Sequence, residues 1–204
     1  MRYSVRDIIR DVRVAIDENE RAEQLLRDPS QETLDLDMLI KSKIEEASRR
    51  VELAAPLFML EEGHQLREAI KWEPLPSHGA GKDWAFGRVL LPDDFMRLTA
   101  FRMSDWERTV HEAIGAEDPL YQRQSSRYKG VRGNPQAPVV AIVSRPAGKT
   151  LEFYSCRSEE AYMTIGNYLP YPEIDEDGTI DICERCYTDV INATAGLIQI
   201  GNRK

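Results

Sequence analysis

The acidic stretch Glu173–Glu184, EIDEDGTIDICE, holds the side chains whose types and spacing come nearest to a chemical site. A helix–loop–helix calcium site takes oxygen ligands at positions 1, 3, 5, 9 and 12 of its loop, with glycine at position 6. When Glu173 is counted as the first position, Gly178 falls on the turn. The other ligand positions are all carboxylates: Asp175, Asp177, Asp181 and Glu184. Calcium binding is therefore one interpretation of this stretch.

The flanking residues favour a different interpretation. A calcium hand needs a helix on each side of its loop. Upstream stands Tyr168–Pro172, YLPYP, whose two prolines do not fit the end of a regular helix. Downstream, apolar residues at helical spacing predict a closing helix that begins near Thr179 and ends at Gly201. The stretch then becomes an acidic turn in which Thr179 or Asp181 caps the helix, and calcium binding stays the alternative.

A CxxC motif, Cys183-Glu-Arg-Cys186, lies at the end of the acidic stretch. Such pairs are typical of zinc and redox sites, and a structural zinc site needs four ligands. The three histidines, His64, His78 and His111, are remote in sequence and none is paired with another. We therefore predict that the two cysteines serve as small apolar residues on one face of the closing helix.

Two further patterns could support catalysis. Asp93 and Asp94 are paired carboxylates that could bind a metal or act as acid and base, but Pro-Asp-Asp is more typical of a turn or a helix cap. Gly79–Lys82 resembles the end of a phosphate-binding loop, yet Asp83 stands where that loop requires Ser or Thr. The sequence therefore predicts no enzyme and no cofactor.

Charge is unevenly spread along a chain whose net charge is −8. Between Tyr121 and Arg157 the only acid is Glu152, and the basic residues are Arg123, Arg127, Lys129, Arg132, Arg145, Lys149 and Arg157. Blocks of unlike charge bear on association more than on fold. We predict that the acidic stretch pairs with the basic block, within one chain or head to tail between copies. The interface candidates are Arg123, Arg127, Lys129, Arg132, Asp175 and Asp177.

The basic block also contains Tyr121 and Tyr128. Basic residues interleaved with aromatic ones can hold a nucleic-acid backbone. The alternative is an ordinary solvated loop, and the net charge of −8 disfavours specific DNA binding. A non-specific contact with DNA stays open.

The composition of the 204 residues, 42% hydrophobic and 30% charged, favours a soluble, ordered protein. No apolar run approaches the roughly 18 residues of a membrane span. The first residues, MRYSVRDIIRDVRVAIDENE, are charged throughout and lack the apolar core of a signal peptide. We therefore expect synthesis in a cytoplasm and no membrane partner.

The predicted elements indicate an α+β fold. Apolar spacing predicts a helix from Ser4 to Ile16 and a long second helix from Thr33 to Pro56. Together with the closing helix they would form a helical bundle of residues 1–60 and 179–204. Residues 61–178 would form an inserted, mostly antiparallel β domain. Its expected strands are 68–72, 84–90, 95–106, 139–143 and 151–156, with a hairpin at 145–149 and a long exposed loop at 122–136.

Two segments of this β domain carry a family resemblance. Val89–Leu98, VLLPDDFMRL, followed by a second strand, resembles the head-to-tail adaptor proteins of tailed bacteriophages. Phe101–Arg108, FRMSDWER, is similar to ring proteins of crAss-like phages that infect gut Bacteroidales. The resemblance extends to the strand pair Pro138–Arg157 and to the closing helix, whereas the first two helices carry no signature.

The resemblance implies a non-enzymatic structural protein of the virion, assembled in the bacterial host cytoplasm. Such adaptors are similar to a helical bundle with an inserted β domain and form rings, expected to hold about twelve copies. The ring lies under the portal protein, joins the phage head to the tail by binding further tail or ring proteins, and lets genome DNA pass through its lumen. The implied fold agrees with the α+β prediction drawn from the residues themselves.

Overall fold

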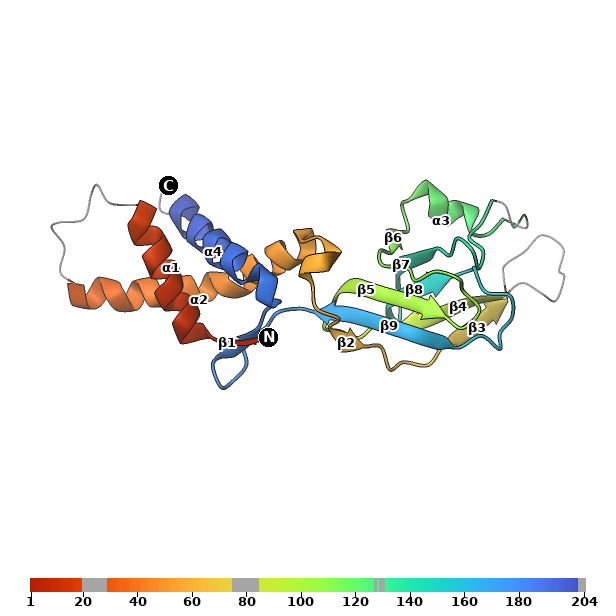
Figure 1. Ribbon diagram of the computed structural model, residues 1–204, viewed down its shortest axis with the longest axis horizontal. Coiled ribbons are helices and arrows are strands. Elements are labelled where there is room, and N and C mark those ends of the chain that lie inside the picture. The colour runs from red at the N-terminus through yellow and green to blue at the C-terminus, as the bar shows by residue number, and fades with distance from the viewer. Residues whose placement is uncertain (20–28, 75–84, 127, 129–130, 202–204) are drawn as a thin grey trace. The chain divides into compact units, whose positions relative to one another are not determined.

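The computed structural model describes residues 1–19, 29–74, 85–126, 128 and 131–201, and the fold is mixed α+β (Figure 1). The chain divides into two compact units. Unit 1 consists of Met1–Glu61 and Tyr171–Lys204, and unit 2 consists of Glu62–Pro170. The predicted second boundary lies at residue 178, whereas residues 171–178 lie with unit 1.

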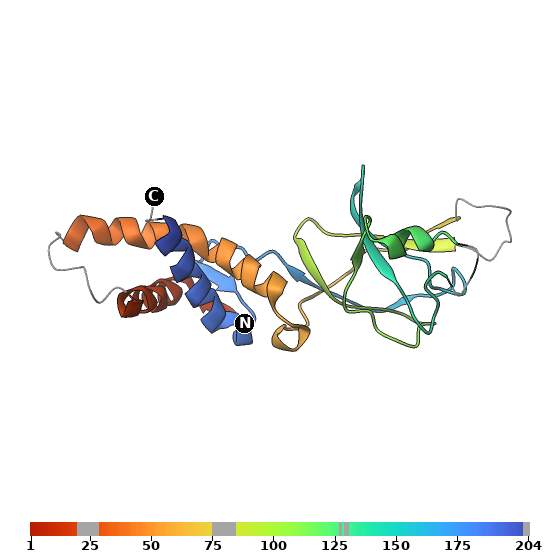
Figure 2. The same ribbon diagram turned by 90° about the horizontal axis from the view of Figure 1, so that it is seen from above.

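The described residues of unit 1 form three α-helices, two short strands and two 3₁₀ turns. In chain order these are β1 (Arg2–Ser4), α1 (Val5–Asn19), α2 (Pro29–Ala54), η1 (Leu57–Met59), β10 (Thr179–Asp181), η2 (Glu184–Cys186) and α4 (Tyr187–Gly201). Figures 1 and 2 show α1, α2 and α4 side by side, and each of these helices contacts the other two.

The helices of unit 1 pack through the apolar faces that their spacing predicts. On α1, Ile8 and Val12 are fully buried. On α2, Ile40, Ile44 and Ala47 are fully buried and form a narrow apolar seam along this helix. Since most of the remaining α2 surface is polar, this seam is what holds the helix against its neighbours.

The predicted start of the closing helix is wrong. Thr179–Asp181 forms strand β10, which pairs antiparallel with β1 in the register Arg2↔Asp181 and Ser4↔Thr179. The helix α4 begins only at Tyr187, after the turn η2. Thr179 and Asp181 therefore cap no helix. Gly178 is confirmed as the bend, with a φ of 76° that L side chains rarely adopt.

In unit 2 the part of the chain that the structure describes forms two sheets and one short helix. A three-stranded sheet has the order β2-β9-β5 and a five-stranded sheet the order β3-β4-β8-β7-β6. All pairs are antiparallel except β6 with β7. The bounds are β2 (His64–Gln65), β3 (Lys71–Pro74), β4 (Ala85–Leu90), β5 (Phe95–Met103), β6 (Ile114–Gly115), α3 (Pro119–Arg123), β7 (Val140–Arg145), β8 (Gly148–Phe153) and β9 (Met163–Pro170).

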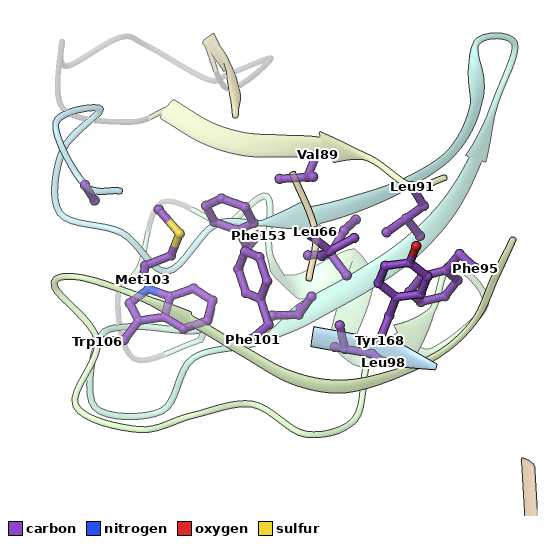
Figure 3. Packing of buried hydrophobic residues seen from close by; sticks show 13 residues of the cluster. Leu66, Val89, Leu91, Phe95, Leu98, Phe101, Met103, Trp106, Phe153 and Tyr168 are labelled. Carbon is purple, nitrogen blue, oxygen red and sulfur yellow. The ribbon is translucent and has the colours of Figure 1, made fainter. Parts of the chain in front are cut away.

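One hydrophobic core draws side chains from both sheets of unit 2. Figure 3 shows Phe153 of β8 close to Phe101 of β5 and to Trp106, with ring centroids 5.2 and 5.7 Å away. Trp72 of β3 meets the same ring edge-on at 5.8 Å. Aromatic rings at such offset and T-shaped geometries contribute beyond the area that they bury. Phe153 is thus the centre of the β unit.

The turns that short-range sequence patterns predict in unit 2 are confirmed. The predicted hairpin at 145–149 is the connection between β7 and β8, whose pairing runs from Val140↔Phe153 to Arg145↔Gly148. Asp93 and Asp94 form a turn, which Phe95 closes by donating its N–H to the carbonyl of Pro92 at 3.0 Å. Strand β9 was not predicted, although it is the central strand of its sheet.

Candidate interaction surfaces

The acidic stretch of unit 1 forms a tight turn. The Asp177 carboxylate accepts hydrogen bonds from the N–H and hydroxyl of Thr179, at 3.1 and 2.6 Å. These bonds, with a smaller contribution from Arg2, lower the pKa of Asp177. The backbone closes the turn as Gly178 N–H donates to the carbonyl of Asp175 at 2.9 Å. The carboxylates of this stretch therefore help to hold its own fold.

Arg2 neutralises part of this acidic turn. Its guanidinium lies 3.1 Å from the Asp175 carboxylate and 3.8 Å from that of Asp177. These groups are at least half exposed, so solvent screens each ion pair and it contributes little stability. The basic block was the predicted pairing partner of Asp175 and Asp177, and within unit 1 both carboxylates pair with Arg2.

The calcium pattern is not assembled as a ligand cluster. Across the described ranges, no group of three or more His, Cys, Asp or Glu side chains is arranged to hold a metal ion. The stretch follows strand β9, so no helix enters the loop, as the two upstream prolines predicted. Asp181 lies opposite Arg2 in the β1–β10 ladder. Glu184 uses its backbone N–H to reach the Glu61 carboxylate at 3.2 Å.

A shallow open groove of about 540 Å³ lies between α2 and the acidic stretch, and we call it the α2 groove. Its Glu45 side chain accepts a hydrogen bond from the N–H of Ile174 at 2.9 Å, which fixes the two segments together. Sequence reasoning missed the groove because its two walls are far apart in the chain. The lining residues are Met38, Lys41, Ser42, Glu45, Ile174, Asp175 and Glu176.

The basic segment of unit 2 is only partly the exposed loop that the sequence predicts. Arg123 is exposed in the last turn of α3, whose first turn is capped by the side chain of Asp118. Arg132 is 8% exposed, and burial lowers its pKa. Arg127 and Lys129 lie outside the described residues. Arg132 is therefore corrected from a surface candidate to a largely buried residue.

The buried side chain of Gln124 links two parts of the backbone in this basic segment. Its side-chain NH₂ donates to the carbonyl of Leu120 at 2.9 Å, and its side-chain oxygen accepts the N–H of Gly133 at 2.9 Å. Gln124 is 1% exposed. A buried amide bonded to two backbone groups ties the end of α3 to the start of the next segment. No periodicity in the sequence marks such an inward-pointing glutamine.

Glu152 is the centre of a buried polar network in unit 2. Its carboxylate is fully buried and lies 2.9 Å from an Arg145 nitrogen and 3.2 Å from Arg88 Nε. Tyr121 and Tyr154 donate their hydroxyls to the same carboxylate at 2.8 and 3.2 Å. The sequence signal was present, since Glu152 is the only acid in the basic block. Arg88 and Arg145 thus balance the buried negative charge of Glu152.

The remaining candidate residues have structural roles. Cys183 and Cys186 are free and buried, as predicted, but they flank and end the turn η2 and do not lie on the closing helix α4. Burial raises the pKa of the Cys183 thiol to about 12. The Asp94 carboxylate accepts a hydrogen bond from the Tyr168 hydroxyl at 3.0 Å. Burial is the larger cause and this hydrogen bond the next, and together they raise the pKa of Tyr168 to about 12. His64 lies 3.9 Å from Asp94.

Comparison with known proteins identifies no family for this chain. No protein-family model matches this chain, and no curated protein matches it either. No helix within the described ranges is both long and apolar enough to cross a membrane.

Proposed function

We propose that this chain is a subunit of a ring that joins the head of a tailed bacteriophage to its tail. The proposal takes unit 1 as the helical bundle of such an adaptor and unit 2 as its inserted β domain. About twelve copies would close a ring under the portal protein, bind further tail or ring proteins, and leave a lumen for genome DNA. The subunit works by assembly and carries out no reaction, and it resides in the virion.

The observation that carries the proposal is the placement of unlike surfaces on different units. Unit 1 exposes the acidic residues Asp175, Glu176 and Asp177, and unit 2 exposes the basic residue Arg123. A ring contact is heterologous, because one patch of a subunit meets a different patch of the next and rotation closes the circle. Charge complementarity of this kind sets orientation and register at an interface.

The motif that resembles the adaptors has a definite place in unit 2. Val89–Leu98 forms the end of β4, the turn at Asp93 and the start of β5. Phe101 and Trp106 of the second motif lie in the core beside Phe153. The motif residues thus build the β unit itself, so the resemblance concerns the unit's fold and supports the proposal at that level.

The test is the assembly state of the full chain. Native mass spectrometry and negative-stain images of the purified protein, alone and with portal protein, are expected to give closed rings of uniform copy number. A protein that stays monomeric at every concentration, with and without portal, refutes the proposal. Calcium titration by calorimetry covers the alternative function at 173–184: heat at millimolar calcium would support it, and its absence would remove it.

A further inference from the structure

We propose that Cys183 and Cys186 form a dithiol–disulfide couple in unit 1, which a small-molecule disulfide such as oxidised glutathione closes into a bond between the end of β10 and the start of α4. The inference goes beyond the proposed function and does not rest on it. It gives the CxxC motif a redox role in addition to its packing role.

The turn η2 brings the two cysteines together. Cys183 is the residue before η2 and Cys186 is its last residue, and the Cys186 N–H donates to the Cys183 carbonyl at 2.8 Å. A four-residue turn closed by such a bond holds its end Cα atoms within about 7 Å, and disulfides join Cα atoms that are about 4.4–6.8 Å apart. Side chains three residues apart in a 3₁₀ turn also lie on the same side. The backbone bend at η2 is therefore compatible with a Cys183–Cys186 bond.

Cys183 is fixed from two sides. Its N–H donates to the Glu52 carboxylate of α2 at 2.8 Å, and its Sγ accepts the N–H of Glu61 at 3.5 Å. A pair that the fold already orders loses less conformational freedom when the bond forms, so folding is expected to favour the disulfide. Glu52 is a positioning residue in this couple, because it acts through the Cys183 backbone.

Other chemistry for the pair lacks partners. A structural zinc site needs four ligands, and among the described residues no three His, Cys, Asp or Glu side chains are arranged to hold a metal. The only other cysteine of the sequence, Cys156, belongs to unit 2. Within unit 1, Cys186 is therefore the one thiol with which Cys183 can form a disulfide.

The reaction is two successive thiol–disulfide exchanges. Deprotonated Cys183 attacks one sulfur of oxidised glutathione, the glutathione S–S bond breaks, and one glutathione thiolate leaves and takes up a proton. Deprotonated Cys186 then attacks the Cys183 sulfur of the mixed disulfide, and the second glutathione leaves in the same way. The protein loses two hydrogens and two electrons, and one oxidised glutathione becomes two reduced ones.

Burial controls the rate of this reaction. Cys183 is 4% exposed and Cys186 is 0% exposed, and burial raises the pKa of both thiols. Exchange therefore needs a local opening of η2, which exposes the sulfur atoms and lets them ionise. The folded chain is expected to oxidise slowly and to keep the bond once it has formed.

The first experiment measures the equilibrium of the couple in the full chain. The protein is incubated with mixtures of reduced and oxidised glutathione, starting from the reduced and from the oxidised chain, until both give the same ratio. Acid quenching, alkylation and peptide mapping then report the fraction with a Cys183–Cys186 bond. The bond is expected to form about tenfold more readily in the folded chain than in urea, which lowers the midpoint potential by about 30 mV.

The second experiment uses variants. Cys186→Ala is expected to form no bond within the chain, whereas Cys156→Ala, the matched control in unit 2, keeps the parent midpoint. Glu52→Ala loses the bond to the Cys183 N–H and is expected to shift the midpoint towards the value in urea. Glu52→Gln keeps an oxygen that can accept this N–H, so it is expected to keep the parent midpoint. Circular dichroism confirms that each variant is folded.

The third measurement is the stability of unit 1. Oxidation and folding belong to one thermodynamic cycle, so a tenfold preference for the bond in the folded chain makes the oxidised chain more stable by about 1.4 kcal/mol. Circular dichroism in urea follows this, because the long helices α1, α2 and α4 all belong to unit 1.

Four results would overturn parts of the inference. A folded chain that stays a dithiol at every glutathione ratio overturns the couple, and so does one that oxidises no more readily than the chain in urea. A bond from Cys156 to either of the other cysteines overturns the pairing. A parent-like midpoint in Glu52→Ala overturns the role of Glu52. Ring closure does not enter these measurements, so their failure leaves the proposed function untouched.

Discussion

Replacement of Gly87 by alanine is expected to destabilise unit 2 through a single clash. A Cβ atom at Gly87 would lie 2.2 Å from Cζ and 2.3 Å from Cε2 of Phe153, which is the direct cross-strand partner of Gly87 in the β4–β8 pair. The ring cannot move aside, because Phe101, Trp106 and Trp72 pack around it. Overpacking of a rigid core costs about 1–3 kcal/mol, and we expect about 2 kcal/mol here.

The chain supplies its own probe for this measurement. All three tryptophans lie within 62–170 in the sequence, so their fluorescence follows the unfolding of unit 2. Urea unfolding is compared for the parent chain, Gly87→Ala and Gly196→Ala. A Cβ at Gly196, in α4 of unit 1, meets nothing within 4 Å. Gly196→Ala is therefore expected to leave the tryptophan transition in place.

A second substitution isolates the clash. The atoms that collide are Cζ, Cε1 and Cε2 of Phe153, and leucine has none of them. Phe153→Leu alone is expected to cost about 1–2 kcal/mol, less than truncation to alanine. In that background Gly87→Ala should cost almost nothing, which corresponds to a coupling of about 2 kcal/mol. Costs that simply add in the double variant, or a neutral Gly87→Ala, would refute this packing argument.

Three further predictions concern buried polar groups. Burial raises the pKa of Glu52, so its folded form binds a proton that the unfolded form releases, and the stability it contributes is lost as the pH rises. Glu52→Gln is therefore expected to be more stable than the parent chain at pH 7, with the difference vanishing near pH 4.3, the ordinary glutamate pKa, as followed by circular dichroism of urea unfolding. Glu152→Ala should destabilise unit 2 by about 3 kcal/mol, because it leaves the Arg145 and Arg88 charges without their buried partner; tryptophan fluorescence in urea measures this. The thiol of Cys183, with its pKa raised to about 12, should react with iodoacetamide at pH 8 only after urea unfolding. Peptide mapping distinguishes it from the partly exposed Cys156, and rapid labelling of Cys183 itself in the folded chain would contradict its burial.

Features that depend on neighbouring residues could be predicted from the sequence. The hairpin at 145–149 and the Asp93 turn follow from the short-range preferences of proline, glycine and aspartate. The buried face of α1 follows from helical spacing, since Ile8 and Val12 lie where that spacing places them. These signals are complete within about ten residues, so no distant partner was needed to interpret them.

Features that depend on a distant partner could not be predicted. Thr179–Asp181 is a strand because Arg2–Ser4, at the other end of the chain, pairs with it. Gly178 and Thr179 are typical of a helix start, but the pairing of β10 with β1 outweighs that local preference. The buried position of Arg132 was missed for a different reason: its neighbour Gly133 bonds to the Gln124 amide nine residues away, and no periodicity in the sequence marks that contact. The α2 groove likewise exists only once α2 and the acidic stretch meet.

The acidic stretch shows why counting charges is a poor guide to an interface. Asp175 and Asp177 were the acidic candidates, yet one faces Arg2 and the other accepts both Thr179 bonds. Reversing their charge is expected to impair assembly, but it would also break this turn, so a lost ring would not locate the contact. Glu176 carries the same charge in the same stretch, is exposed and lines the α2 groove. A charge reversal at Glu176 is therefore expected to spare the turn, and it can test an intermolecular contact made by the acidic stretch.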